Sequence, residues 1–213
     1  MTDTMTMVAT PKQEYIQLAS DEQIERTVRA LAANGIQALV VEDGAAARQA
    51  ILDLLPEGAE VFTSTSQTLE AIGVLPDINE SGRYDAIRPK LMKLDRNTQA
   101  REMRKLASSP DFVVGSVHAI TEQGQLLIAS GGGSQLTAYA YGAGQVIWVV
   151  GTQKIVRDLA AGLQRIEEHS LPLEDARMRQ LRGVGSRVGK ILIVNAERAG
   201  RATVILVKEA LGF

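Results

Sequence analysis

One acidic residue lies where a carboxylate could take part in covalent chemistry. Glu122 is in the segment AITEQGQLL, at the expected turn between two short apolar runs. A carboxylate beside backbone amide donors can act as a nucleophile or a general base. Glu, Gln and Gly are also common at a hairpin turn on a protein surface, so both interpretations of Glu122 stay open.

Two loops have residues that could hold an anion. In IASGGGSQLTAYA, an expected strand ends at Ala129, three glycines follow, and Ser134 stands where a helix N-cap would be. In FTSTSQTLEAIG, hydroxyl side chains lie between a strand and a helix. Such loops follow the carboxyl ends of strands, where ligands collect in open α/β sheets, although a tight turn or plain N-capping would explain each of them. The candidate ligand-binding residues are Thr63, Ser64, Thr65, Ser66, Gly131, Gly132, Gly133 and Ser134.

The composition excludes several kinds of site. The chain of 213 residues has no cysteine and only two histidines, so it cannot form a disulfide, a thiolate nucleophile or a cysteine-held cluster, and we expect no metal site. His118 could be a general base or a structural histidine. A net charge of -2 gives no general attraction for nucleic acid, so no nucleic-acid partner is expected.

The chain has no segment typical of secretion or membrane insertion. Residues 1–19 have no apolar core of signal-peptide length and are expected to be flexible. The longest apolar run, Val146 to Val150, is far too short to span a bilayer. We therefore expect a cytoplasmic protein with no membrane partner and one domain over residues 20–213.

Alternating strand and helix patterns must position these residues. Helical spacing of apolar residues and short β-branched runs alternate along the chain, which predicts βαβ units and an α/β fold with a mainly parallel sheet. The segment 74–89, rich in turn residues, is expected to be a long connection. Helices are expected over 21–34, 45–55, 67–73, 90–108, 155–168 and after Pro172. Strands are expected over 38–41, 60–62, 112–115, 146–150, 191–194 and 203–207, with a hairpin at 119–129.

The order of several blocks resembles one known family. SVHAITEQGQLLIASGGGSQLTAYAYGAGQVIWVVGTQKIVRDL is similar to the core of the LUD domain family, the lactate-utilization LutC/YkgG-like proteins, and TSTSQTLEAIG and RATVILVKEALGF fit the same family. The resemblance covers roughly residues 22–213. It implies a single three-layer α/β domain of the NagB/RpiA/CoA-transferase type.

The resemblance also implies a function. LUD proteins are linked to the conversion of lactate to pyruvate, so the chain is expected to be a cluster-free component of lactate utilization that binds a small anionic ligand. Longer members carry a cysteine cluster that this chain lacks, and iron-sulfur subunits of a lactate oxidation system are expected partners. A homodimer is a further expectation, because this symmetry is common.

A catalytic alternative follows from the wider superfamily. Residues 121–124, Thr-Glu-Gln-Gly, are similar to the Ser-Glu-Asn-Gly motif of CoA-transferases, in which the carboxylate attacks an acyl-CoA thioester. Glu122 would then be catalytic in a CoA-transferase, a thioesterase or a sugar-phosphate isomerase-like enzyme. CoA or a phosphorylated or carboxylate compound would be the ligand, with no cofactor held by the chain itself. A non-catalytic regulatory or scaffold subunit is the third interpretation.

Overall fold

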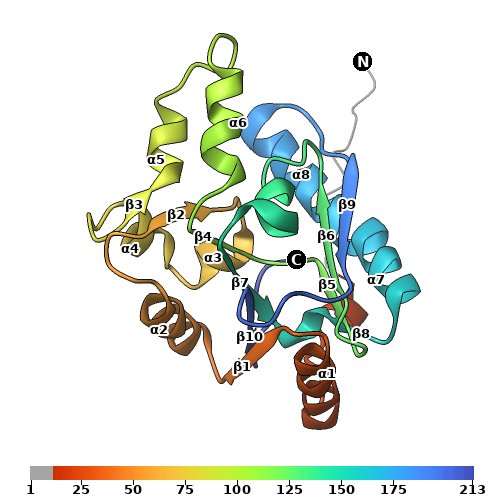
Figure 1. Ribbon diagram of the computed structural model, residues 1–213. Coiled ribbons are helices and arrows are strands. Elements are labelled where there is room, and N and C mark those ends of the chain that lie inside the picture. The colour runs from red at the N-terminus through yellow and green to blue at the C-terminus, as the bar shows by residue number, and fades with distance from the viewer. Residues whose placement is uncertain (1–11) are drawn as a thin grey trace, which may run out of the picture.

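Apolar, β-branched runs form a six-stranded sheet at the centre of the protein. The computed structural model describes residues 12–213, and all neighbouring strands of this sheet are parallel (Figure 1). Its strands, in spatial order, are β1 (Gln37–Val41), β10 (Ala202–Val207), β7 (Gln145–Gly151), β4 (Phe112–Gly115), β2 (Glu60–Thr63) and β3 (Asp85–Ala86).

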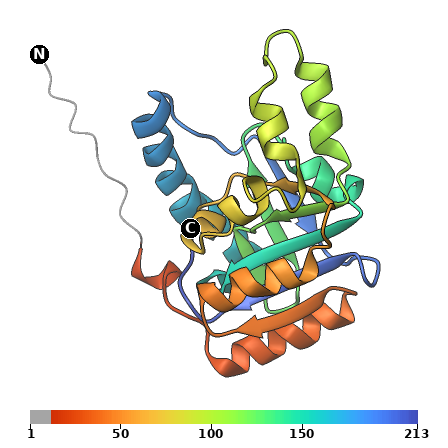
Figure 2. The ribbon, with the colours of Figure 1, turned by 90° about the vertical axis from the view of Figure 1, so that its left-hand side faces the viewer.

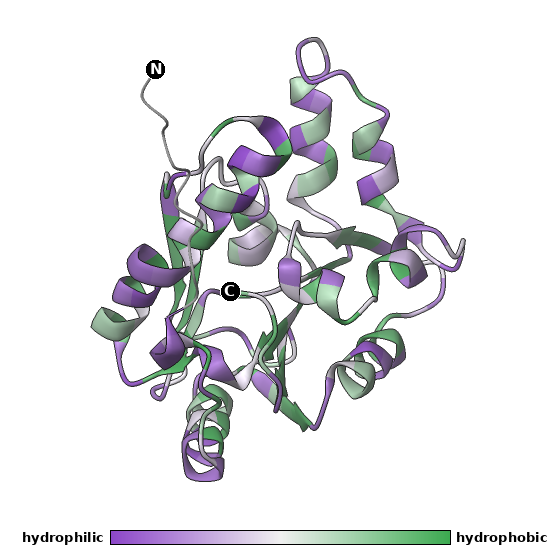
Figure 3. Ribbon diagram, turned by 180° about the vertical axis from the view of Figure 1, so that it is seen from behind, coloured by the Kyte–Doolittle hydropathy of each residue, from purple (hydrophilic) through white to green (hydrophobic). Residues whose placement is uncertain are grey.

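Both faces of this sheet are buried. In β10, Val204 and Leu206 join one apolar cluster, whereas Ile205 and Val207 join another. Successive side chains of a strand point to opposite faces, so continuous apolar runs are expected where both faces are covered. In Figure 3 the strands of the sheet are mainly green, the colour of hydrophobic residues, whereas the helices around them are partly green and partly purple.

Helices cover one face, and a second sheet together with further helices covers the other. Residues of α2, α3 and α4 pack with the cluster that contains Ile205, whereas α1 and the second sheet pack with the cluster that contains Val204. The bounds of these helices are α1 (Asp21–Ala33), α2 (Gly44–Leu54), α3 (Gln67–Ala71) and α4 (Leu75–Asn79). The expected three-layer α/β fold with a mainly parallel sheet is confirmed.

The second sheet contains the expected hairpin. β5 and β6 are antiparallel, β8 pairs in parallel with β5, and β9 pairs antiparallel with β6. Helices that follow β8 in the chain pack on the outer side of this sheet. The elements are β8 (Ile155–Val156), β5 (Ala119–Thr121), β6 (Leu126–Ser130), β9 (Lys190–Val194), α7 (Leu159–Arg165), the π-helix η4 (Ile166–Ser170) and α8 (Leu171–Arg182).

One expected helix is interrupted at an aspartate whose side chain binds nearby donors. The helix expected over 90–108 is two helices, α5 (Ile87–Met92) and α6 (Ala100–Ser108), which stand side by side in Figure 2. Between them, the Asp95 carboxylate accepts hydrogen bonds from the Asn97 amide and the Thr98 hydroxyl. Such local bonds compete with a helix.

The second correction concerns the helix expected over 155–168. The Asp158 side chain accepts a hydrogen bond from the Ala161 amide and so caps a helix that begins only at Leu159. Residues 155 and 156 are thereby free to pair with β5 as strand β8. The segment 74–89, expected to be a connection, contains α4 and β3.

The described part of the N-terminal segment contacts the rest of the protein. Residues 1–11 of the segment expected to be flexible lie outside the described residues. Beyond them, the 3-10 helix η1 (Gln13–Tyr15) lies against η4, where Lys12 Nζ is 2.5 Å from a Glu168 carboxylate oxygen. Within residues 12–213, no helix has both the length and the apolar character needed to cross a membrane.

Truncation of the central strand should destabilise the protein strongly. Ile205 is fully buried in β10, so Ile205→Ala should lower the free energy of unfolding by about 2–5 kcal/mol, through lost apolar burial and a cavity. Urea denaturation followed by circular dichroism would measure the change. The matched control is Ile191→Ala in the edge strand β9, where the residue is 42% exposed. Equal losses in the two variants would contradict the two-sided burial of the main sheet.

Candidate functional site

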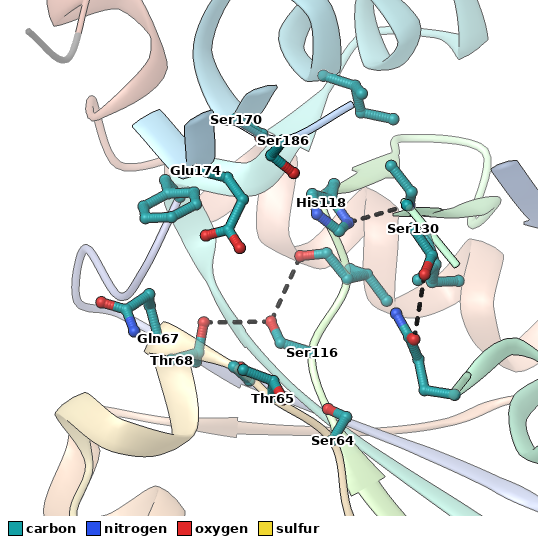
Figure 4. A pocket seen from close by; sticks show the side chains of 18 of the residues that line it. Ser64, Thr65, Gln67, Thr68, Ser116, His118, Ser130, Ser170, Glu174 and Ser186 are labelled. Atoms are coloured by element: carbon teal, nitrogen blue, oxygen red, sulfur yellow. Dashed lines mark hydrogen bonds between the residues drawn. The ribbon is translucent and has the colours of Figure 1, made fainter. Parts of the chain in front are cut away.

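A cavity opens at the carboxyl ends of the central parallel strands. Its volume is about 240 Å³, and its walls come from the residues after β2, β4, β6 and β7 together with η4 and α8. Figure 4 shows hydroxyl side chains from these separate elements arranged around it. This is the edge at which open α/β sheets bind ligands.

The hydroxyl-rich loop after β2 contributes to the cavity in part. Ser64, Thr65 and Ser66 line it. Thr63 does not, because its hydroxyl donates to Asn79 Oδ1 at 3.2 Å on the α4 side of the strand. The Ser66 hydroxyl accepts a hydrogen bond from the Leu69 amide and caps α3, so the N-capping interpretation holds for this residue.

The glycine loop after β6 also contributes in part. Gly131 and Ser134 line the cavity, whereas Gly132 and Gly133 are not among the lining residues. The expectation that Ser134 caps a helix is wrong: the helical segment here is the π-helix η2 (Ala138–Gly142), and its N-terminus has no side-chain cap. The chain turns instead through the Gly133 amide, which donates to the Ser130 hydroxyl.

The most unusual group in the wall is a buried lysine. Lys154 is 1% exposed and lies in the 3-10 helix η3 (Thr152–Lys154), directly after the central strand β7. Its Nζ donates to Thr68 Oγ1 at 3.0 Å, Ser116 Oγ at 3.3 Å and the Val117 carbonyl at 3.3 Å. Within the described chain it has no carboxylate partner, and burial lowers its pKa well below the ordinary value.

A second buried cation lies behind this wall. Arg165 is fully buried and donates to the carbonyl of His118 at 2.6 Å and to the Ser170 hydroxyl at 3.2 Å. Burial lowers the pKa of Arg165 to about 10, which still leaves the guanidinium charged at neutral pH. Burial and the neighbouring Lys154 and Arg165 lower the pKa of His118 to about 3.

The neutral His118 has a fixed tautomer. Its Nδ1 accepts a hydrogen bond from the Ala129 amide at 3.1 Å, so Nε2 is the protonated nitrogen. Such a ring can donate a hydrogen bond to a ligand, but it cannot supply a general acid at neutral pH.

Further cations line the cavity, with one carboxylate beside them. Arg88 reaches it from α5 and donates to the Thr65 hydroxyl, and burial lowers its pKa. Arg177 also lines it, but it forms a bidentate pair with Glu174 at 2.7 and 2.9 Å. With Arg187 and Lys154, four basic side chains face one acidic side chain.

Glu122, the candidate catalytic residue, does not line this cavity. Arg26 Nε donates to one of its carboxylate oxygens at 2.9 Å, and Gln23 Nε2 donates to the other at 3.1 Å. These bonds lower its pKa. Glu122 instead joins the β5–β6 turn to α1.

The comparisons place the whole core of the chain in one family. The family model described as the LUD domain matches residues 24–207. The chain belongs to the LUD domain family. A solved structure of a DUF162 family protein from Deinococcus radiodurans superposes with a TM-score of 0.55 at 15% identity, over 90% of this chain and 99% of that one. No curated protein matches the sequence.

The cavity of this LUD domain is lined by several residues that the sequence pattern did not single out. Lys154 and Thr68 are the main ones, with Ser116 between them. The available signal was the polar triplet Thr-Gln-Lys directly after the apolar run of β7, at the carboxyl end of a central strand. A helix expected to begin at residue 155 makes this triplet look like a plain connection between a strand and a helix.

The ion pair of Glu122 predicts a pH-dependent contribution to stability. The folded-state pKa of Glu122 is lowered by Arg26 and Gln23, so its stabilisation is present above the ordinary pKa of 4.5 and is lost as the pH falls through the lower folded value. Glu122→Gln should therefore lower the urea midpoint modestly at neutral pH, and the difference from the wild type should shrink below that window.

The control for this variant is Glu25→Gln. Glu25 lies on α1, the helix of Arg26, and one of its carboxylate oxygens is 3.6 Å from an Arg29 guanidinium nitrogen. Its side chain is 70% exposed, so the loss of this ion pair should change the urea midpoint less. An undiminished difference between Glu122→Gln and the wild type at low pH would contradict the ion-pair role.

Proposed function

We propose that this LUD-domain protein binds a small anionic metabolite in the cavity and acts in lactate utilization as a component without a cysteine-held cluster. The observation that carries the proposal is the excess of basic over acidic side chains around the cavity, four against one. Lys154 and Arg165 strengthen it, because neither has a carboxylate partner within residues 12–213.

The cost of burying cations favours an anion as the ligand of the cavity. A buried cation costs free energy unless a counter-charge or hydrogen bonds compensate it. Hydroxyls and carbonyls compensate Lys154 in part, whereas a bound anion would add the missing opposite charge. The hydroxyls of Ser64, Thr65 and Ser130 can donate hydrogen bonds to the oxygens of a carboxylate or a phosphate.

The dimensions of the cavity favour a small ligand. Pockets for drug-sized molecules have volumes of roughly 300–1,000 Å³, whereas this one measures about 240 Å³. A short carboxylic acid or a phosphorylated fragment matches this space better than a complete CoA molecule. The family link to lactate makes lactate and pyruvate the first compounds to test, and iron-sulfur subunits of the same system are the proposed partners.

Arg88 provides a direct test of anion binding. Lactate, pyruvate and inorganic phosphate would be titrated by calorimetry into the wild type and into Arg88→Ala. A hydrogen bond to a charged group contributes about 1.5–3 kcal/mol, so the variant should bind the preferred anion at least about tenfold more weakly. Affinity should also fall as salt is added.

The matched control is Arg101→Ala, because Arg101 is an exposed arginine on the neighbouring helix α6. It should retain wild-type affinity. The proposal is refuted if none of the three anions binds, or if Arg101→Ala weakens binding as much as Arg88→Ala.

The cellular role has a separate test. Deletion of the gene should impair growth on lactate and leave growth on glucose intact, and the wild-type gene should restore growth where Arg88→Ala does not. Purification of the tagged protein from lactate-grown cells, followed by mass spectrometry, would identify iron-sulfur partners. Unimpaired growth of the deletion strain on lactate would contradict the role in lactate utilization.

A further inference from the structure

The buried lysine has properties that binding of an anion does not require. Arg88, Arg177 and Arg187 already bring permanent charge to the cavity. Lys154 adds a primary amine, which, unlike a guanidinium, can lose its proton and become a nucleophile.

The surroundings of Lys154 favour the neutral amine. The side chain is 1% exposed, and its Nζ contacts two hydroxyls and one carbonyl. The neighbouring charge that acts on it is another cation, Arg165, and both desolvation and this cation lower the pKa of Lys154. A lysine that is desolvated or placed next to another cationic group is the kind that forms Schiff bases.

We propose that Lys154 forms a reversible imine with a small oxo acid bound in the cavity. This inference rests on the anion-binding function above and specifies the class of ligand. The amine nitrogen attacks the ketone or aldehyde carbon and gives a carbinolamine. The carbonyl oxygen then leaves as water with both amine protons, a C=N bond remains, and nothing is oxidised or reduced.

The groups around Nζ fit this step. Thr68 and Ser116, which are hydrogen-bonded to each other in Figure 4, lie within 3.3 Å of the amine and can pass protons between nitrogen and oxygen as the carbinolamine collapses. Thr68 is itself fixed, because its hydroxyl also donates to the Leu211 carbonyl at 3.2 Å.

The rest of the cavity recognises the acid part of the ligand. Arg88 and the loop with Ser64 and Thr65 offer donors to a carboxylate, and the small volume limits the chain attached to it. A bound oxo acid would thus be held at both ends, by its carboxylate and by its carbonyl carbon. Lactate has the same carboxylate and no carbonyl, so it would bind without reacting.

Borohydride trapping tests the proposal. The protein would be incubated near neutral pH with pyruvate or glyoxylate and sodium borohydride, which reduces an imine to a stable amine. Intact mass and peptide mapping should then show one added ligand, located on Lys154. Exposed lysines such as Lys93 and Lys105 should be labelled at least about tenfold less, because they lie outside the cavity and no bound oxo acid is held next to their amines.

Matched controls separate this proposal from simple binding. Lactate should compete and reduce trapping, and acetone, which has a carbonyl and no carboxylate, should be trapped much less. Lys154→Arg has no primary amine to attack the carbonyl carbon, so it should give no adduct. Lys105→Arg should give the wild-type adduct.

The outcomes distinguish the two proposals. Suppose that calorimetry shows binding of lactate or pyruvate. If Lys154 then carries no reduced adduct, or no more adduct than the exposed lysines, the imine proposal is refuted and the anion site stands. If no anion binds and no adduct forms, both fail. Because peptide mapping of the wild type locates the adduct directly, the result holds even if Lys154→Arg does not fold.

Discussion

Within residues 12–213, the burial of Lys154 without a carboxylate partner is the constraint around which the site is arranged. An ammonium removed from water needs several hydrogen-bond acceptors, and here they come from distant parts of the chain: Thr68 in α3 and Ser116 and Val117 after β4. The parallel sheet makes this possible, because the carboxyl ends of β2, β4 and β7 meet at one edge.

Close packing at this edge depends on the small size of two glycines. A Cβ at Gly115 would lie 1.7 Å from the Tyr139 hydroxyl, and one at Gly212 would lie 2.5 Å from Thr68 Oγ1. Gly212 also has a φ of +62°, a conformation that other residues adopt at a cost. The C-terminal residues are therefore held against the same hydroxyl that accepts from Lys154.

The sequence predicted the elements whose cause is local. The capping box at Ser20 and the β-branched runs of β7 and β10 depend on neighbouring residues alone, so α1, β7 and β10 were predicted close to their observed bounds. The interruptions at Asp95 and Asp158 were missed, because an aspartate inside an apolar period looks like one more polar position until its side chain binds a nearby donor.

The sequence predicted only those residues of the candidate site that directly follow the end of a strand. Ser64 to Ser66 and Gly131 follow strand ends, and the structure places both segments around one cavity. The importance of Lys154 depends instead on what surrounds it in three dimensions, which no spacing reveals. Glu122 shows the converse: its motif suggested chemistry, but its neighbours on α1 engage both of its oxygens.

The surroundings of Glu122 and Lys154 thus stabilise opposite protonation states. A carboxylate that is fully hydrogen-bonded and paired with Arg26 has its charged form stabilised, which makes it a weaker nucleophile and base. An amine that is buried beside hydroxyls and a second cation has its charged form destabilised, so more of it is neutral and has a free lone pair for nucleophilic attack. In a chain without cysteine, a desolvated amine is the nucleophile that can still be activated by burial alone. Lys154, and not Glu122, is therefore the residue on which the proposed imine chemistry rests.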